Sequence, residues 1–142
     1  MNLIEQLRRE EGTARFAYEC SLGFWTIGVG RNIDKRSGAG LSPDEIDYLL
    51  ANDVARVTAE IKANLPWAAQ LDEPRFAVLA GMAFQLGLKG MLEFKKTLDA
   101  VRKQRYTDAA FFMLDSKWAR QTPARAARMA LQMRSGQWQL TP

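Results

Sequence analysis

The sequence predicts an α+β fold, with a small β-hairpin near the N-terminus of an otherwise helical chain. Two observations support this prediction. Residues 15–20 and 24–29 alternate in a period of two on either side of a Ser21–Gly23 turn, which is the pattern of two paired strands. Beyond Pro66 the apolar residues recur at helical spacing, so the rest of the chain is expected to be helical.

Residues 2–11 are predicted to form the first helix. Leu3, Ile4 and Leu7 make one apolar stripe, which Glu11 continues before Gly12 ends the helix. A carboxylate in phase with a buried face either has a partner or acquires a raised pKa. Glu11 is therefore a candidate acid, and the alternative is a solvated glutamate at a frayed helix end.

The hairpin that follows supplies further candidate residues. If it folds back over the end of the first helix, Glu11, Cys20 and Thr26 can line one side of a cleft. Gly28 and Gly30 mark places where backbone or ligand approaches closely. The polar, glycine-rich residues 31–41 are expected to form a loop or a short third strand.

A long helix is predicted to begin at Ser42, which can cap it, with Pro43 at the first helical position and Glu45 completing a capping box. Its apolar residues keep a helical period up to Pro66. Further helices are expected from Phe76 to about Gly87, from Leu92 to Val101, from Thr107 (as the cap) to Leu114, and from Thr122 to Gly136. The residues expected in the core are Leu98, Phe111, Phe112, Leu114, Trp118 and Met129.

Composition excludes several classes of enzyme. The 142 residues, 47% hydrophobic and 25% charged, suit one globular domain. The absence of histidine excludes Ser-His-Asp and Cys-His catalysis and the usual zinc sites, and the single cysteine excludes an internal disulfide. A net charge of +4 favours polyanions, but an ordinary solvated surface explains it equally well. We see no secretion signal or membrane-spanning run.

The order of motifs resembles the phage-type lysozymes (muramidases, glycoside hydrolase family 24). Glu11 stands before Gly12, an aromatic strand follows, and residues 23–30 read G-x-x-T-I-G-x-G. GMAFQLG at 81–87, GMLEFKKTL at 90–98 and SKWARQTPARAAR at 116–128 are similar to family segments in the same order. The resemblance implies one lysozyme-like domain over residues 1–142. Its expected parts are a small lobe at about 12–41, a linking helix at about 42–64, and a helical lobe at 65–142 that includes helix 2–11.

The resemblance also implies catalytic roles. The family has a catalytic Glu, an Asp nine residues later and a Thr six beyond it, and these positions hold Glu11, Cys20 and Thr26 here. Glu11 is expected to be the general acid and Thr26 to position water. Cys20 could activate water, attack the anomeric carbon or only position, and a neighbouring carboxylate is expected to raise its pKa. The alternative is a small apolar residue on a strand.

Other expected site residues come from the resemblance alone. Arg125 is expected to support Glu11, with an ordinary surface arginine as the alternative, and Arg31 is expected to form a structural ion pair with Asp53. Lys117 replaces a family arginine, and Phe112 replaces a polar contact residue. The residues expected to contact the sugar chain are Asn32, Phe84 (alternatively a core residue), Gln85, Thr97 and Lys117.

The sequence therefore predicts an endolysin-type muramidase that cleaves the β-1,4 bond between N-acetylmuramic acid and N-acetylglucosamine in bacterial peptidoglycan. We expect a monomer without metal or cofactor, without nucleic acid as partner and without stable membrane insertion. It is expected in the cytoplasm of an infected host before release to the cell wall. The alternative is a wall-binding module silenced by the Asp-to-Cys change; a nucleic-acid binder is disfavoured because no recognition motif or basic stripe is present.

Overall fold

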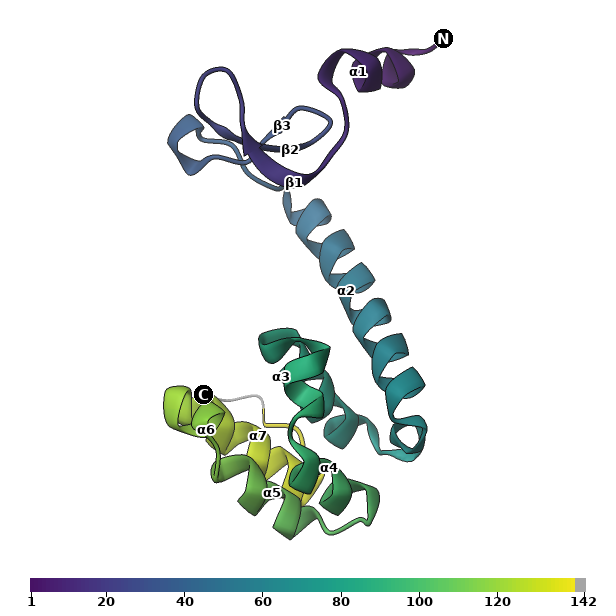
Figure 1. Ribbon diagram of the computed structural model, residues 1–142, viewed down its shortest axis with the longest axis vertical. Helices are drawn as coiled ribbons and strands as arrows, with labels where there is room; N and C mark the ends of the chain where they lie inside the picture. Colours follow the sequence, from purple (N-terminus) through teal and green to yellow (C-terminus); the bar gives the residue numbers. More distant parts are fainter. Residues whose placement is uncertain (140–142) are drawn as a thin grey trace. The chain divides into compact units, whose positions relative to one another are not determined.

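The computed structural model describes residues 1–139 and divides into two compact units, Met1–Leu50 and Ala51–Pro142, each described here by itself. The described residues form seven α-helices and one antiparallel sheet with strand order β1-β2-β3 (Figure 1). The predicted α+β, lysozyme-like fold is confirmed. The expected grouping of helix 2–11 with the helical lobe stays a prediction.

The first helix, α1 (Leu3–Glu11), begins with a capping box. The Asn2 side chain accepts a hydrogen bond from Glu5 N–H (3.0 Å), and Glu5 Oε2 accepts one from Asn2 N–H (2.9 Å). None of its residues is buried, and Leu3 and Ile4 are 69% and 65% exposed. No element of Met1–Leu50 covers the apolar stripe of α1. Its expected burial stays a prediction, together with the grouping of this helix with the helical lobe.

The sheet consists of β1 (Ala14–Glu19), β2 (Trp25–Gly28) and β3 (Arg31–Asn32). The strands confirm the predicted hairpin and the short third strand. Only Thr26 is buried among the strand residues, and Phe16 is 78% exposed, so the expectation of a half-buried β1 is wrong. Alternation in sequence shows which side chains share a face, but it does not show that a second layer covers that face.

The long helix α2 (Pro43–Asn64) starts as predicted. Glu45 N–H donates to Ser42 Oγ (3.2 Å), and Ser42 N–H donates to Glu45 Oε1 (2.9 Å), which is the expected capping box. Its buried residues, Val57 and Ile61, belong to the core of the second unit.

The second unit is helical throughout. After the 3-10 turn η2 (Pro66–Gln70) come α3 (Glu73–Leu92), α4 (Lys95–Arg102), α5 (Tyr106–Leu114), α6 (Lys117–Gln121) and α7 (Pro123–Ser135) (Figure 1). α3 is interrupted at Gly87, whose φ of 77° and ψ of 161° are not helical, so the predicted helix end near Gly87 is confirmed; a short second helical stretch then continues to Leu92. The sequence did not predict α6, which Ser116 caps by accepting from Ala119 N–H (3.1 Å). Thr107 is not a cap, since α5 already begins at Tyr106.

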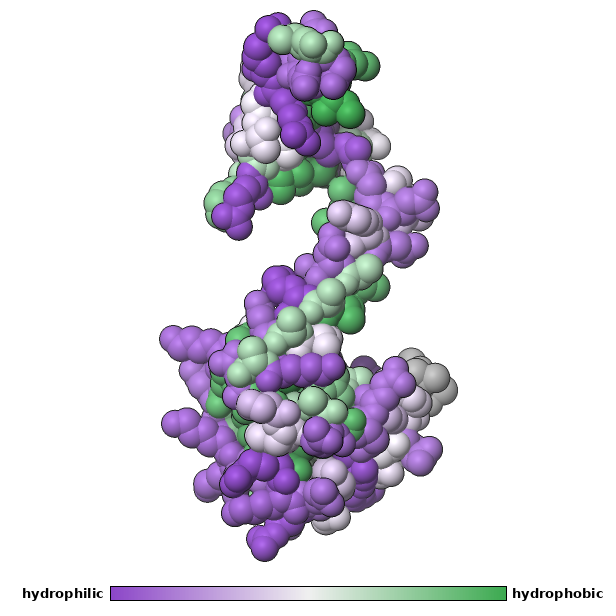
Figure 2. Space-filling model, turned by 90° about the vertical axis from the view of Figure 1, so that its right-hand side faces the viewer, coloured by the Kyte–Doolittle hydropathy of each residue, from purple (hydrophilic) through white to green (hydrophobic). Residues whose placement is uncertain are grey.

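The core of this unit is rich in methionine. Four methionines are fully buried: Met82, Met91, Met113 and Met133. Leu98 and Trp118 are also buried, and Phe112 and Met129 are partly buried against this core. Phe111 and Leu114 are exposed, contrary to prediction, because α5 turns Ala109, Ala110 and Met113 inward instead. Figure 2 shows hydrophilic side chains over much of the visible surface around this core.

Arg75 joins the start of α3 to the end of α7. Its Nε donates to the Met133 carbonyl (2.7 Å) and its Nη2 to the Arg134 carbonyl (3.0 Å), while the guanidinium stacks 3.6 Å from the Tyr106 ring centre. Gly136 has a φ of 69°, and a Cβ there would lie 2.9 Å from Arg75 Nη1. This glycine therefore ends α7, as predicted, and also leaves room for the arginine.

Among the described residues, no single helix is long and apolar enough to cross a bilayer. α3 and α4 reach that length and composition only when taken together, across a bend of 100°.

Candidate active site

The loop between β1 and β2 places Cys20 beside Thr26. Cys20 N–H donates to the Phe24 carbonyl (2.9 Å), and Gly23 N–H donates to the Cys20 carbonyl (2.8 Å), which closes the loop. Hydrogen bonds from the backbone N–H groups of Leu22 and then Phe24 lower the pKa of the Cys20 thiol; partial burial opposes them, and the Thr26 hydroxyl adds to them. The loop thus favours a negative charge on the side chain at position 20.

The direction of this pKa shift corrects the sequence analysis, which expected a neighbouring carboxylate to raise the pKa of Cys20. The shift comes from backbone amides that the tight turn aims at the side chain, and partial burial is the effect that opposes them. An aspartate in a turn commonly accepts the same kind of bond from a backbone N–H two residues ahead. Cys20 therefore occupies a position suited to an anionic side chain.

Thr26 lies in the middle of the sheet, where β2 pairs it with Tyr18 on β1 and Asn32 on β3. Its side chain is buried, with 4% of the residue exposed, and its hydroxyl donates to the Phe24 carbonyl (3.0 Å). A hydroxyl that donates to the backbone keeps its oxygen lone pairs as acceptors. Thr26 can therefore accept a hydrogen bond from a water molecule beside Cys20.

Glu11 is the last residue of α1, and its side chain lies against the turn between β2 and β3. A Cβ on Gly30 would come within 2.8 Å of Glu11 Oε2 and 3.0 Å of its Cδ. Gly30 also has a φ of 65°, a conformation that favours glycine. The predicted close approach is confirmed at Gly30, where the absence of a side chain makes room for the carboxylate; at Gly28 a Cβ would meet nothing within 4 Å.

Glu11 is exposed within the first unit. The reason is the same as for α1 as a whole: the apolar stripe that Glu11 continues has no covering layer there. The cleft that the sequence analysis expects beside Glu11 stays a prediction.

Asp34 is a buried carboxylate that sequence reasoning missed. It is 5% exposed and accepts hydrogen bonds from Trp25 N–H (3.0 Å), Arg36 N–H (2.8 Å) and the Arg36 guanidinium. Arg36 and then the Trp25 amide hold the pKa of this carboxyl well below its usual range. The available signal was an Asp two residues before Arg36 at the start of a turn, since Asp34 caps the 3-10 turn η1 (Lys35–Ser37).

Asn32 also stabilises the segment after β3. Its Oδ1 accepts hydrogen bonds from Asp34 N–H and from Ser37 Oγ, both at 2.9 Å. A contact from Asn32 to a sugar would therefore use the donors of its amide nitrogen.

Arg31 pairs with Glu45, so the expected Arg31–Asp53 ion pair is wrong. Arg31 and then the Ser42 amide lower the pKa of Glu45 to about 2. Asp53 instead pairs with Arg56 on its own helix (3.3 Å). Glu45 lies in the first turn of α2, and Asp53 lies about 12 Å further along it at 1.5 Å per residue; Arg31 therefore binds the earlier carboxylate.

The second unit holds the other predicted residues. Phe84 is 43% exposed, so its interpretation as a core residue is wrong, and Gln85 Oε1 next to it accepts from Trp118 Nε1 (2.9 Å). Thr97 is 2% exposed and lines a cavity of about 590 Å³ together with Phe94 and Phe112. Lys117 is exposed at the start of α6.

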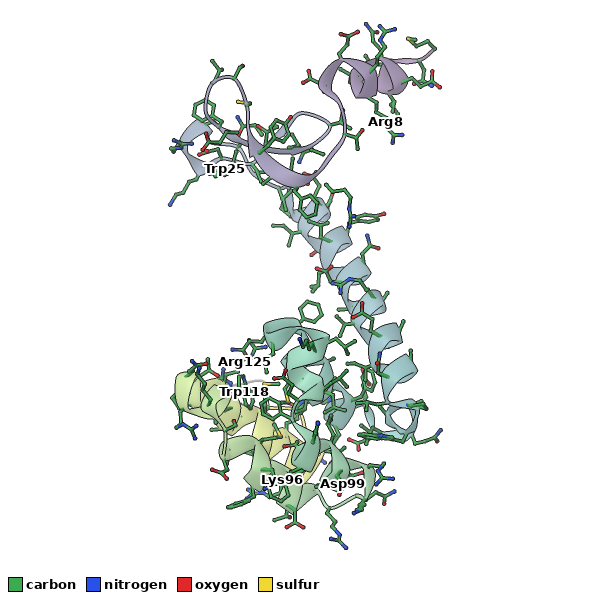
Figure 3. The ribbon with its side chains drawn as sticks, in the orientation of Figure 1. Arg8, Trp25, Lys96, Asp99, Trp118 and Arg125 are labelled. Carbon is green, nitrogen blue, oxygen red and sulfur yellow. The ribbon has the colours of Figure 1, made fainter. Side chains whose placement is uncertain are left out.

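Arg125 is half-buried near the start of α7 (Figure 3), and its Nη2 donates to the Gly81 carbonyl on α3 (3.2 Å). It also lines a cavity of about 460 Å³ beside Met129 and Trp138. This guanidinium is therefore held in place by the fold of its unit. Its approach to Glu11 stays a prediction.

Comparisons with known proteins give consistent matches. The family model described as phage lysozyme matches residues 8–135. The chain is 27% identical to a Dictyostelium discoideum protein named probable T4-type lysozyme 1, over 95% of each chain. It is 27% identical to the pre-baseplate central spike protein Gp5 of Enterobacteria phage T4, over 96% of this chain and 28% of that protein. A protein named endolysin, of Acyrthosiphon pisum secondary endosymbiont phage 1, is 26% identical over 58% of this chain and 55% of its own length.

We predict that Gly30→Ala displaces the Glu11 carboxylate, whereas Gly28→Ala does not. Both glycines have a positive φ, 65° and 68°, so each alanine costs about 1–2 kcal/mol of stability. Only the Cβ at position 30 meets Glu11. Urea unfolding should show similar losses for both variants, while the carboxyl carbon resonance of Glu11 should shift in Gly30→Ala alone. An equal shift in both variants would contradict the contact.

We also predict that the Arg31–Glu45 pair makes stability depend on acid pH. Because the folded pKa of Glu45 is depressed, its contribution is present above the ordinary value of 4.5 and is lost as pH falls through about 2. Glu45→Gln, which keeps the capping box, should unfold at a lower temperature than the parent at neutral pH and at the same temperature at pH near 2. The matched control is a double-mutant cycle: Arg31→Gln should couple to Glu45→Gln but add independently to Asp53→Asn.

Proposed function

The chain belongs to the phage lysozyme family, and on that premise we propose that it cleaves the β-1,4 bond between N-acetylmuramic acid and N-acetylglucosamine in bacterial peptidoglycan. The family and the T4-type lysozyme relatives make the chain a lysozyme-type glycosidase. A relative named endolysin supports the more specific role of an endolysin-type muramidase.

In this proposal Glu11 is the general acid. Its carboxylate rests on Gly30, in the same small unit as the paired Cys20 and Thr26, and this arrangement is the observation that most supports the function. Glycoside hydrolysis requires a carboxylic acid that protonates the leaving oxygen. A sugar chain bound over Glu11 would exclude water from the carboxyl group while it protonates the leaving oxygen.

Cys20 and Thr26 serve the attacking water. The thiolate of Cys20 accepts a proton from water, the water oxygen bonds to the anomeric carbon, and the glycosidic bond breaks as Glu11 protonates the leaving oxygen. Thr26 holds the water through its hydroxyl oxygen. Attack by water on the face opposite the leaving group gives an inverting reaction, and the lowered pKa of Cys20 supports its role as base.

The residues that bind and orient in this proposal belong to the second unit, except Asn32 of the first. Arg125 supports the orientation of Glu11 through its charge, and the fixed position of its guanidinium within α3 and α7 suits that role. The proposed sugar contacts are Asn32, Phe84, Gln85, Thr97 and Lys117. We further propose a monomer that acts on the cell wall after release from the cytoplasm of an infected host, without nucleic acid as partner and without stable membrane insertion.

A second candidate is a peptidoglycan-binding module that has lost catalysis. Cys20 at the position where the family has Asp favours it, because an ordinary thiol is mostly protonated at neutral pH and then cannot accept a proton, whereas a carboxylate is ionised. The two candidates differ in whether the protein breaks the glycan chain.

We predict that the parent protein clears a suspension of purified peptidoglycan and that Glu11→Gln reduces the rate by about 10²–10⁴-fold, the usual contribution of a general acid. The matched control is Glu10→Gln. Glu10 is the adjacent exposed carboxylate and pairs with Arg9 (2.9 Å), so its removal changes the charge equally but should leave the rate near that of the parent.

The products identify the bond. Borohydride reduction of the released fragments should convert N-acetylmuramic acid, and not N-acetylglucosamine, to its alditol. Binding of the parent and of Glu11→Gln to the cell wall without clearing by either would favour the binding module. Clearing by Glu11→Gln at the parental rate would remove Glu11 from the mechanism.

A further inference from the structure

Arg36 binds the loop that contains Cys20, although it follows β3 in the sequence. Its Nη2 donates to the Gly23 carbonyl (2.7 Å), and its guanidinium lies 5.6 Å from the centre of the Phe24 ring. These contacts fix two consecutive residues of the loop. Phe24 supplies one backbone N–H to the Cys20 thiol. Gly23 directly follows Leu22, whose backbone N–H is the other donor to this thiol.

Asp34 holds Arg36 in this place. Asp34 Oδ1 accepts a hydrogen bond from Arg36 Nε (3.0 Å), and Asp34 Oδ2 accepts one from Arg36 Nη2 (2.6 Å), so the carboxylate binds the guanidinium in a bidentate manner. Oδ2 also accepts from Trp25 N–H (3.0 Å), which ties the carboxylate to the first residue of β2. The side chain of Asp34 is only 4% exposed, whereas that of Arg36 is 64% exposed. The carboxylate is thus the fixed point, and Arg36 extends from it to the loop.

We propose that Asp34 and Arg36 are positioning residues of the glycosidase reaction, which hold the 20–24 loop so that its backbone amides face the side chain at position 20. The inference rests on the proposed role of Cys20. Neither residue needs to contact substrate, because both act through Gly23 and Phe24. We call the Asp34–Arg36 pair, with its contacts to Gly23 and Phe24, the clamp. Loss of the clamp would let the loop move, and the backbone amides would no longer stabilise an anion at position 20.

Simple electrostatics is the competing explanation. Arg36 carries a positive charge against the loop that contains the thiol. Its own pKa is raised by Asp34 first and, to a smaller extent, by Glu19, the neighbour of Cys20. A charge effect would depend only on the sign and distance of the cation. The clamp depends on a guanidinium that spans Asp34 and Gly23 together, which the single ammonium of a lysine reproduces only in part.

The experiment measures the pKa of Cys20 from the rate of alkylation by iodoacetamide across the neutral and alkaline range. Cys20 is the single cysteine of the chain, so the rate reports this thiol alone. The variants are Arg36→Gln, Arg36→Lys and Asp34→Asn. The matched control is Lys35→Gln, which removes an equal charge from the adjacent exposed position. Peptidoglycan turnover is measured for each variant in parallel.

We expect Arg36→Gln and Asp34→Asn to raise the pKa of Cys20 toward that of a free thiol, about 8.5, and to lower kcat more than they raise KM. Lys35→Gln should match the parent, and Arg36→Lys should fall between the parent and Arg36→Gln. A parental profile in Arg36→Gln would overturn the proposal, as would an equal upward shift in Lys35→Gln.

Circular dichroism identifies a variant that fails to fold. If Arg36→Gln does not fold, the folded Arg36→Lys variant decides the question. An alkylation profile like that of the parent overturns the clamp, and a profile shifted toward higher pH supports it. The alkylation profile does not depend on turnover. If the variants shift the alkylation profile but the parent does not clear peptidoglycan, the clamp is supported and the proposed function is rejected. If the parent clears peptidoglycan but the variants leave the profile unchanged, the clamp alone is rejected.

Discussion

The site depends on one local interaction, the hydrogen bonding of backbone amides of a tight loop to the side chain at position 20. A five-residue segment closes on itself through Cys20 and Phe24, and its N–H groups lower the pKa of the thiol. Backbone amides carry no net charge, so they stabilise an anion without adding a cation. The loop therefore favours an anion at position 20 whichever residue stands there, while the choice between Asp and Cys sets the starting pKa, about 3.9 or about 8.5.

A second constraint places the acid. Glu11 reaches the sheet because Gly30 has no side chain, and the positive φ of that glycine turns the chain from β2 into β3 at the same point. The small unit thus holds the proposed acid, base and water-positioning residue on three consecutive segments of chain. The helical unit has a different design, with a core of buried methionines and an arginine, Arg75, that joins its first and last helices. It offers surfaces for a ligand but no part of the proposed proton transfer.

Much of the fold could be predicted from the sequence because its signals are local. The capping box at Ser42 and Glu45, the hairpin around the turn at 21–23 and the glycine at 136 all depend on residues a few positions apart. The predictions that were wrong depend on tertiary packing. Spacing identified the helical segment 107–114 but could not show which face of α5 points inward. Alternation over residues 15–20 could not show whether a second layer covers β1.

The same distinction applies to the site. Glu11, Cys20 and Thr26 were identified from the motif, and the structure places the last two side by side. Asp34 and Arg36 were missed because they follow β3 in the sequence and bind backbone groups of Trp25 and Gly23, respectively, which sequence spacing does not show. Arg31 was given the wrong partner because two carboxylates of one helix were candidates. The direction of the Cys20 pKa shift was also wrong, since the amides that cause it belong to a turn whose exact geometry the sequence does not show.

The most direct test of the account is the rate of peptidoglycan cleavage by Cys20→Asp, Cys20→Ser and Cys20→Ala beside the parent protein. If the loop stabilises an anion that serves as the base, aspartate should be at least as active as cysteine. Serine, which is similar in size but does not ionise at neutral pH, should then be nearly as inactive as alanine. Parental activity in the serine and alanine variants would contradict the account, because the reaction would then need no charge at this position.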